Sequence, residues 1–216
     1  EKEKEEKLKE TKATLKDLWI RPNIRKKTFI LYFTWFVNSF VYYGISLNTN
    51  ALGGNAFLSF ALAGLVEVPS YILTRFGRRM PLMWAMLGGG IGCLATIPFS
   101  TNDDYVWMRV SCAMVGKFCV TASYAMIYVY SAELYPTVAR NVGVGSSSMV
   151  ARIGSIMAPF VKELSQYTHI GLVMAIFGCL SIADAFLVLL LPETKGKEIP
   201  DTIEEAENFG NSRKIF

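Results

Sequence analysis

Histidine is almost absent from the sequence, and cysteine is absent from any metal-type arrangement. The one histidine, His169, lies at the end of a long apolar stretch, where we interpret it as interfacial. The four cysteines lie within apolar stretches without CxxC spacing, which is typical of buried side chains. The sequence shows no Ser-His-Asp set and no phosphate-binding loop. We therefore expect no enzyme, no metal site and no cofactor.

Charge is missing from most of the chain, although Lys and Arg outnumber Asp and Glu by 22 to 18. Ten of the 22 basic residues fall within the first 27 positions, where they alternate with glutamates. A nucleic-acid-binding surface would be basic without so many interleaved acids, so we expect no nucleic-acid partner. Long stretches with almost no charge are typical of membrane-spanning helices.

Six apolar stretches reach the length of about 20 residues that a membrane-spanning helix needs. They occupy residues 28–47, 56–76, 81–99, 105–130, 142–161 and 169–191. We therefore predict an all-α membrane protein with three regions. These are a charged cytoplasmic segment at 1–27, a six-helix transmembrane half-bundle at 28–191 and a cytoplasmic tail at 192–216.

The connections between the apolar stretches are short and differ in charge. We expect a surface helix that ends at Pro22, a loop at 131–141, a turn at 162–168 and a partly ordered tail. Lys and Arg gather in alternate connections, so the positive-inside rule places both chain ends in the cytoplasm. An even number of crossings follows from that placement. We expect an integral protein of the plasma membrane, with the lipid bilayer as a partner.

Among the charged residues in the apolar stretches, three stand out by their depth, because a charge costs at least ~2.5–3.5 kcal/mol at the bilayer centre. They are Glu67, Lys117 and Arg152. At ~1.5 Å per residue, Lys117 is roughly 18 Å below one membrane surface and Arg152 roughly 15 Å from the other. All three are thus expected near the midplane, around a shared polar cavity. Two cations against one acid leave a positive charge for a substrate carboxylate, unless Lys117 or Arg152 simply neutralises Glu67 in a buried pair.

Aromatic residues accompany these charges. Lys117, Thr121, Tyr124 and Tyr128 follow the spacing of one helix face. The first apolar stretch adds Trp35, Tyr42 and Tyr43. Aromatic faces attract quaternary ammonium groups, so these residues predict the wall of a pocket for a small organic ion. Ordinary packing inside the membrane is the alternative for the four tyrosines.

Other residues in the apolar stretches have structural interpretations. Asp184 is expected to make a structural hydrogen bond near the inner end of the last stretch. The glycines at 88–92 form a small surface that lets another helix approach closely.

Four short stretches resemble the C-terminal half of the organic cation, carnitine and organic anion transporter family, within the Major Facilitator Superfamily. They are RFGRR at 75–79, SAELYPTVARN at 131–141, PETKG at 192–196 and EVP at 67–69. The resemblance implies twelve helices in two halves that alternate access to a substrate held between them. The chain, which opens without a methionine, is then expected to be a fragment with helices seven to twelve. Its partner would be the missing N-terminal six-helix half, and sodium is a candidate coupling ion.

The same resemblance bears on the substrate and on a gate. Cation carriers of that family typically have Asp where this sequence has Arg152, whereas carnitine and anion carriers have Arg there and Lys at the position of Lys117. The resemblance therefore favours a zwitterionic, carnitine-like or anionic carboxylate substrate. It also implies a cytoplasmic gate of ion pairs, for which helix capping is the alternative. The gate residues are Arg75, Arg78, Arg79, Glu133, Arg140 and Glu193.

Competing functions stay open. The nearest alternative is an organic cation transporter that uses Glu67 as the counter-ion. A receptor or channel subunit belongs to another class, although no filter-like loop is visible. A truncated product without transport of its own is a further alternative.

Overall fold

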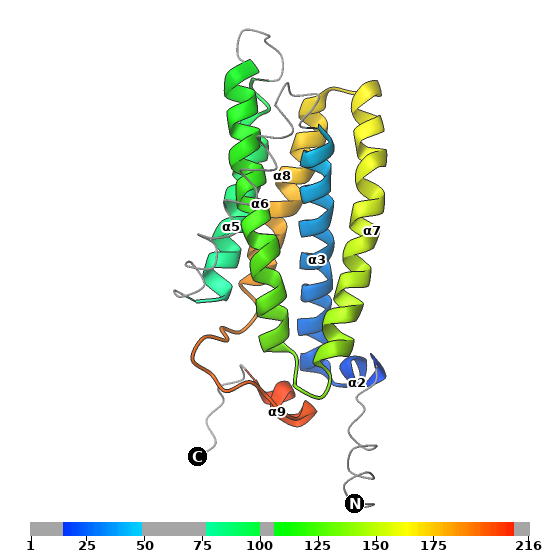
Figure 1. Cartoon of the computed structure of the whole chain (residues 1–216), viewed down its shortest axis with the longest axis vertical. Coiled ribbons are helices and arrows are strands. Elements are labelled where there is room, and N and C mark those ends of the chain that lie inside the picture. Colours follow the sequence, from blue (N-terminus) through cyan, green and yellow to red (C-terminus); the bar gives the residue numbers. More distant parts are fainter. Residues whose placement is uncertain (1–14, 49–76, 100–105, 210–216) are drawn as a thin grey trace, which may run out of the picture.

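The computed structural model describes residues 15–48, 77–99 and 106–209 of the 216-residue chain. Every regular element in these residues is a helix (Figure 1). The elements are α2 (Leu15–Ile20), α3 (Pro22–Asn48), α5 (Arg79–Ala95), α6 (Val106–Leu134), α7 (Arg140–Tyr167), α8 (Ile170–Val188) and α9 (Ile203–Asn208).

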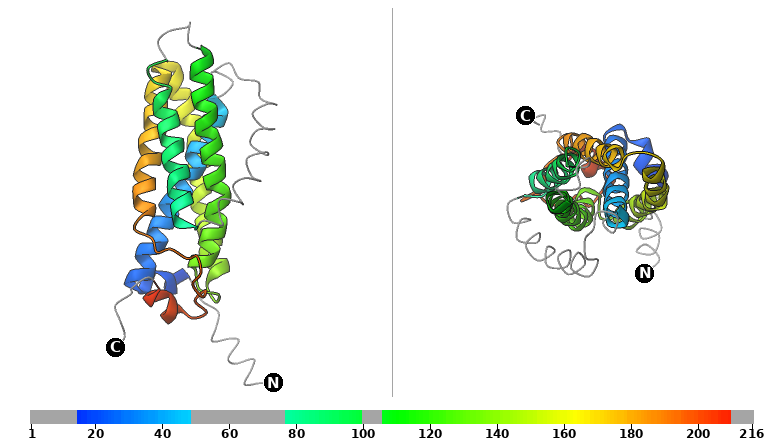
Figure 2. Two further views of the ribbon diagram at one scale, coloured as in Figure 1. Left: turned by 90° about the vertical axis from the view of Figure 1, so that its left-hand side faces the viewer. Right: turned by 90° about the horizontal axis from the view of Figure 1, so that it is seen from above.

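The five long helices lie side by side in a bundle, with the short α2 and α9 at one end (Figure 1). We call this the basal end. α3 packs along α7 and also touches α6 and α8, whereas α5 packs against α6 and α8 (Figure 2). α3 and α5 both begin at the basal end, so the end of α3 and the start of α5 lie at opposite ends of the bundle. The predicted stretch 56–76 falls between them and lies outside the described residues.

Four of the described helices are long and apolar enough to cross a membrane. They comprise Pro22–Leu47, Met108–Leu134, Arg140–Leu164 and Ile170–Val188. α5 has 17 residues, which is the lower limit of the length a crossing requires. The prediction of an all-α membrane protein is therefore confirmed, while the count of six spans stays a prediction.

Several helix boundaries differ from those predicted. The loop expected at 131–141 shrinks to 135–139, because α6 continues to Leu134 and α7 begins at Arg140. The turn expected at 162–168 is wrong, since α7 stays helical through Tyr167. Lys162, Glu163 and Leu164 favour helix, and a helix need not stop where its apolar stretch ends. The break expected at Pro22 is confirmed between α2 and α3.

Glycines let three helix pairs approach to backbone contact. A Cβ atom on Gly92 of α5 would lie 2.7 Å from the Cα atom of Gly116 on α6. A Cβ atom on Gly154 of α7 would lie 2.6 Å from the carbonyl oxygen of Phe36 on α3, and one on Gly90 of α5 would lie 2.9 Å from that of Gly178 on α8. The close approach expected at 88–92 is confirmed.

Gly154→Ala is expected to destabilise the chain, because the added methyl group overlaps the α3 backbone. Overpacking of this kind typically costs about 1–3 kcal/mol. Gly145→Ala on the same helix is the matched control, since nothing lies within 4 Å of its added Cβ atom. The thermal midpoints of the two variants in detergent would be compared, and equal midpoints would contradict the close α3–α7 contact.

Polar side chains inside the bundle are bonded between helices. Asp184 on α8 accepts a hydrogen bond of 2.7 Å from the Thr34 hydroxyl on α3, and both residues are fully buried. Ser123 on α6 donates to the Asn38 side chain on α3. The structural role expected for Asp184 is confirmed. These bonds fix α3 against α6 and α8 at the level of the candidate site.

Candidate functional site

Five aromatic residues from α3 and α6 meet in the middle of the bundle. The Trp35 ring lies 4.4 Å from the Tyr128 ring and 6.1 Å from the Tyr124 ring, between centroids. Tyr42 lies 5.8 Å from Tyr124 and 5.3 Å from Tyr43. We call Trp35, Tyr42, Tyr43, Tyr124 and Tyr128 the aromatic cluster. The structure therefore brings together five of the predicted binding residues.

The aromatic cluster has a buried base and an open edge. Trp35 is fully buried, and its indole nitrogen donates a hydrogen bond of 2.9 Å to the Ser131 hydroxyl. Tyr43 and Tyr128 are exposed by 43% and 44%. Ring faces carry partial negative charge, so an open aromatic edge can receive an organic cation. Leu134 lies ten residues beyond Tyr124, which puts the cluster about 15 Å from the basal end of α6.

Lys117 lies on α6, two turns from Tyr124, and only 6% of its surface is exposed. Its carbonyl oxygen accepts a hydrogen bond of 2.8 Å from the Thr121 hydroxyl, which lies on the same helix face. Thr121 is also buried.

Arg152 lies midway along α7 and its side chain is exposed. Two residues of α7 contact α3: a Cβ atom on Gly154 would lie 2.6 Å from the Phe36 carbonyl oxygen, and Ser146 accepts a hydrogen bond of 2.7 Å from the Tyr32 hydroxyl. Arg152 lies between them in the sequence and is exposed. Lys117 and Arg152 therefore differ sharply in burial, although both lie well inside long helices. Glu67, the third predicted charge, lies outside the described residues.

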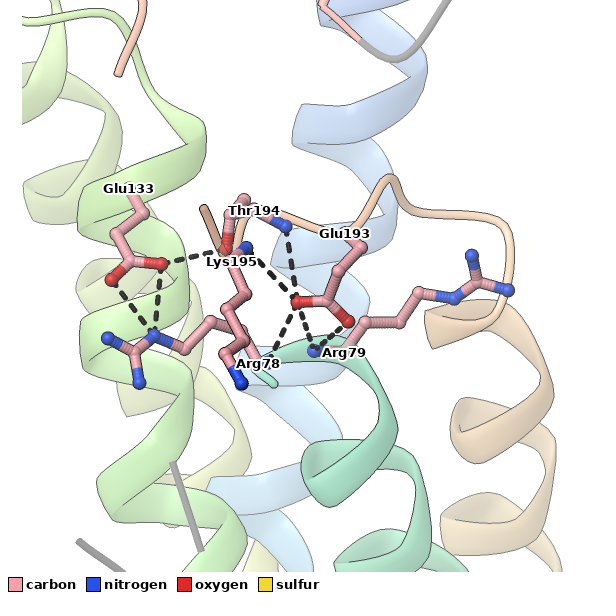
Figure 3. Close-up of polar contacts among 6 residues, drawn as sticks. All are labelled: Arg78, Arg79, Glu133, Glu193, Thr194 and Lys195. Atoms are coloured by element: carbon pink, nitrogen blue, oxygen red, sulfur yellow. Dashed lines mark hydrogen bonds and ion pairs between the residues drawn. The ribbon is translucent and has the colours of Figure 1, made fainter. Parts of the chain in front are cut away.

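A second group of predicted residues meets at the basal end (Figure 3). The Arg78 Nε atom donates to both Glu133 carboxylate oxygens, at 2.9 and 3.1 Å. The Thr194 hydroxyl donates to the same carboxylate at 2.7 Å. Arg78 precedes α5, Glu133 ends α6 and Thr194 follows α8. This ion pair thereby joins three segments, with each side chain about one quarter exposed or less.

Glu193 binds backbone groups at the start of α5 (Figure 3). Its carboxylate accepts hydrogen bonds from the backbone N–H groups of Arg78 at 2.8 Å and Arg79 at 3.2 Å, and from those of Thr194 and Lys195. Glu193 thus caps the α5 N-terminus, where a negative charge is favourable, and the ion pair predicted for it stays a prediction. A Cβ atom at Gly77, whose φ is +143°, would lie 3.4 Å from this carboxylate.

The Glu193 cap depends on pH in a defined direction. Burial alone raises the pKa of the Glu193 carboxyl, but the four N–H donors together hold this pKa below its ordinary value. A lowered folded-state pKa means that the stabilisation is fully present above the pKa of an unfolded glutamate. It is lost only as pH falls through the lower folded-state pKa. The cap therefore stays intact at neutral pH.

The other predicted gate residues contribute differently. Arg79 donates only its backbone N–H to Glu193, and its Nε atom has no hydrogen-bond partner among the described residues. Arg140 donates to the Thr137 hydroxyl at 3.3 Å. The ion pairs predicted for Arg79 and Arg140 stay predictions. Arg75 lies outside the described residues.

The tail is docked on the bundle, which the sequence interpretation missed. The Glu207 carboxylate of α9 accepts hydrogen bonds of 3.0 Å from the backbone N–H groups of Asn23 and Ile24, at the start of α3. The Lys27 ammonium donates to the carbonyl oxygens of Ala206 and Phe209 at 2.8 and 2.6 Å. A capping box, in which Thr202 and Glu205 bind each other's backbone N–H groups, starts α9. This T-x-x-E pattern is visible in the sequence and could have predicted the helix.

A bundle of apolar helices with an aromatic site inside and a charged network at one end is typical of a membrane transporter. Residues 1–159 match the sequence model of the Major Facilitator Superfamily. That match covers well over half of the chain, so the chain belongs to the Major Facilitator Superfamily.

Curated relatives with similar sequences are named as transporters. The chain is 51% identical over 203 residues to the organic cation transporter protein of Drosophila melanogaster, covering 92% of this chain and 36% of that protein. It is 40% identical over 209 residues to organic cation transporter 1 of Caenorhabditis elegans, covering 94% and 35%. It is 38% identical over 214 residues to the carcinine transporter of Drosophila melanogaster, covering 97% and 31%. These names agree with the prediction of a transporter-class membrane protein and not an enzyme.

The chain spans about a third of the length of the curated relatives it matches. Of the predicted binding residues, the aromatic cluster is assembled by the structure. Lys117 is buried on α6, whereas Arg152 is exposed on α7.

Proposed function

We propose that this chain is the C-terminal six-helix half of a transporter that moves small organic ions by alternating access. The substrate class favoured is a zwitterion with a cationic, carnitine-like end and a carboxylate. The observation that carries the proposal is the aromatic cluster, whose open edge lies between α3 and α6 at mid-bundle.

The cationic end of the substrate fits the aromatic cluster. Tyr43 and Tyr128 are partly exposed. Trp35 and Tyr124 pack against Tyr128, and Tyr42 packs against Tyr43. A desolvated cation over aromatic faces gains up to about 2 kcal/mol. The buried hydrogen bond from Trp35 to Ser131 keeps the indole oriented.

The carboxylate end is assigned to Lys117 and Arg152. Removing a charge from water is costly unless an opposite charge accompanies it, so two intramembrane cations favour an anionic group nearby. Arg152 offers an exposed guanidinium on α7, and such a group binds a carboxylate in a bidentate fashion. A substrate with both charges would use both parts of the site.

Alternating access is proposed to involve the basal end. The Arg78–Glu133 pair and the Glu193 cap tie α5, α6 and the segment after α8 together. This side of the bundle is assigned to the cytoplasm, because Lys and Arg concentrate there. The missing N-terminal half would rock against it in the plasma membrane, with sodium as a candidate coupling ion.

The test is uptake by the protein that pairs this chain with an N-terminal half. Labelled probes would be a quaternary ammonium zwitterion, the same compound with its carboxylate amidated, and a plain organic anion, each with and without sodium. Preference for the zwitterion over its amide is expected. An amide transported equally well would remove the carboxylate subsite from the proposal.

A second candidate is an organic cation transporter with Glu67 as the counter-ion. The aromatic cluster suits an organic cation without a carboxylate equally well, and two of the relatives carry the name organic cation transporter. Under this alternative the amidated probe is preferred, and Glu67→Gln abolishes its uptake.

A further inference from the structure

A groove lies at the basal end of α3, apart from the proposed transport site. Its volume is about 630 Å³. α2 contributes Trp19, the first turns of α3 contribute residues 23–30, and Leu190 and Phe209 line it from the segments after α8 and α9. We call it the interfacial groove.

The charges of the interfacial groove are mostly positive. Arg25, Lys26 and Lys27 line it, against the single carboxylate of Glu207. Glu207 already accepts from two backbone N–H groups, and Lys27 already donates to two carbonyl oxygens. Arg25 and Lys26 are exposed. The groove thus presents two adjacent cations on its rim, where an anion would bind without displacing the tail.

The remaining lining is apolar and opens onto the outer surface of the bundle. Phe29 and Leu190 are exposed by 63% and 72%. Phe29 lies in α3 and Leu190 follows the end of α8, and both helices are apolar enough to span a membrane. Phe186, one turn before Leu190 on α8, is exposed by 60%. An apolar surface therefore runs from the groove along the outside of the bundle, in the direction of the bilayer core.

The short helix α2 marks the level of the membrane surface. It buries Leu18 against the bundle but exposes Trp19 and Ile20, by 42% and 71%. Trp is the residue that most favours the boundary between headgroups and acyl chains. The Trp19 ring lies 6.2 Å from the Tyr32 ring of α3, so Tyr32 is level with that boundary. Arg25 and Lys26, two turns nearer the start of α3, then lie at headgroup level, and Phe29 lies between them and the acyl region.

We propose that the interfacial groove binds one anionic phospholipid of the cytoplasmic leaflet. The phosphate of the headgroup contacts Arg25 and Lys26, and an acyl chain lies along Phe29, Leu190 and Phe186. Basic pockets at the cytoplasmic ends of transmembrane helices favour such headgroups, and each basic residue near the surface contributes attraction. Because the tail forms one wall of the groove, the bound lipid holds α9 against α3.

The cations and the apolar surface of the groove together distinguish a lipid from a free anion. A soluble phosphate would need the cations alone, whereas a phospholipid needs both the cations and the apolar surface. The occupant we favour is therefore the lipid, because the cationic rim and the exposed apolar strip are continuous.

The test measures the thermal midpoint of the full chain, purified in a neutral detergent, during titration with dioctanoyl phosphatidylserine. A ligand that binds only the folded state raises the midpoint with concentration. Dioctanoyl phosphatidylcholine and inorganic phosphate serve as the other titrants. We expect phosphatidylserine to raise the midpoint and the other two to leave it nearly unchanged.

Variants locate the effect in the groove. Lys26→Gln is expected to weaken the apparent affinity for phosphatidylserine about fivefold, and Arg25→Gln with Lys26→Gln about 25-fold. Leu190→Ser, an exposed position, should weaken phosphatidylserine binding without altering any response to phosphate. Lys162→Gln removes one charge from the opposite end of the bundle and is the matched control. An equal response to phosphatidylcholine or to phosphate would overturn the proposal, as would a response that survives in the double variant.

Discussion

Replacing Arg152 with alanine is expected to reduce uptake of a carboxylate substrate by at least ~30-fold. Truncating one partner of a desolvated charge pair costs about 2–5 kcal/mol, and 2 kcal/mol corresponds to roughly 30-fold in affinity. The fold should tolerate the change, because the Arg152 side chain is exposed. Uptake and surface expression would be measured together in cells that produce the complete transporter.

A second variant and a second probe test whether the effect of Arg152→Ala is specific to the carboxylate. Arg152→Lys keeps the charge but loses the bidentate geometry, so it should retain part of the uptake. The amidated, purely cationic probe should be carried by Arg152→Ala at least as well as by the unaltered protein. Unchanged uptake of the carboxylate probe would remove Arg152 from the binding site.

Replacing Arg78 with alanine is expected to lower the maximal rate of transport roughly 5–30-fold while substrate affinity changes little. The Arg78–Glu133 pair is only one quarter exposed or less and is reinforced by Thr194, so it is better held than a solvated surface pair. Its loss shifts the balance between conformations by about 1–2 kcal/mol, a factor of roughly 5–30 in population. Initial rates over a range of substrate concentrations would separate rate from affinity.

Arg79→Ala is the matched control for the gate. Its guanidinium is directed away from Glu133, and it reaches Glu193 only through its backbone N–H (Figure 3). The maximal rate should therefore fall much less than in Arg78→Ala. A double-mutant cycle of Arg78→Ala with Glu133→Gln should show coupling of about 1 kcal/mol. Additive effects, or equal losses in Arg78→Ala and Arg79→Ala, would show that the ion pair is no part of a gate.

The sequence predicts the described apolar helices because each can be recognised from the length and the apolar composition of its own segment. The ends of the helices are harder to predict. The segment at 162–167 is polar yet helical, since its residues favour helix and nothing at the membrane surface breaks it. The 135–139 connection is shorter than expected because Tyr135 is buried, with its hydroxyl 3.3 Å from that of Ser147 on α7.

The aromatic cluster could be predicted in part. Spacing along α6 correctly places Tyr124 and Tyr128 on one face, and these rings lie 5.8 Å apart. The packing of that face on Trp35 depends on how α3 and α6 cross, which no single-helix pattern contains. The difference in burial between Lys117 and Arg152 is likewise set by neighbouring helices. From the sequence alone, Lys117 and Arg152 are both charges inside an apolar stretch, so the sequence does not show which of them is buried.

At the basal end, the motifs identify the residues but not the hydrogen bonds that these residues form. The resemblance selects Arg78, Glu133 and Glu193, and the structure brings these three residues together. It does not reveal that Glu193 binds backbone N–H groups at the start of α5, because that requires the turn at Gly77 and the path of the chain after α8. The contact of Glu207 with the start of α3 joins residues more than 180 positions apart. A local pattern identifies only the capping box of α9.

The central claim is that the aromatic cluster and Arg152 face one water-accessible space within the membrane. The most direct measurement is labelling of Tyr128→Cys and Arg152→Cys by a membrane-impermeant thiol reagent, in the complete transporter with its native cysteines replaced. We predict that both positions are labelled from water and that a zwitterionic substrate protects both. Phe186→Cys, on the apolar outer surface of α8, should stay unlabelled. Labelling of neither site position, or labelling that substrate leaves unchanged, would contradict the account.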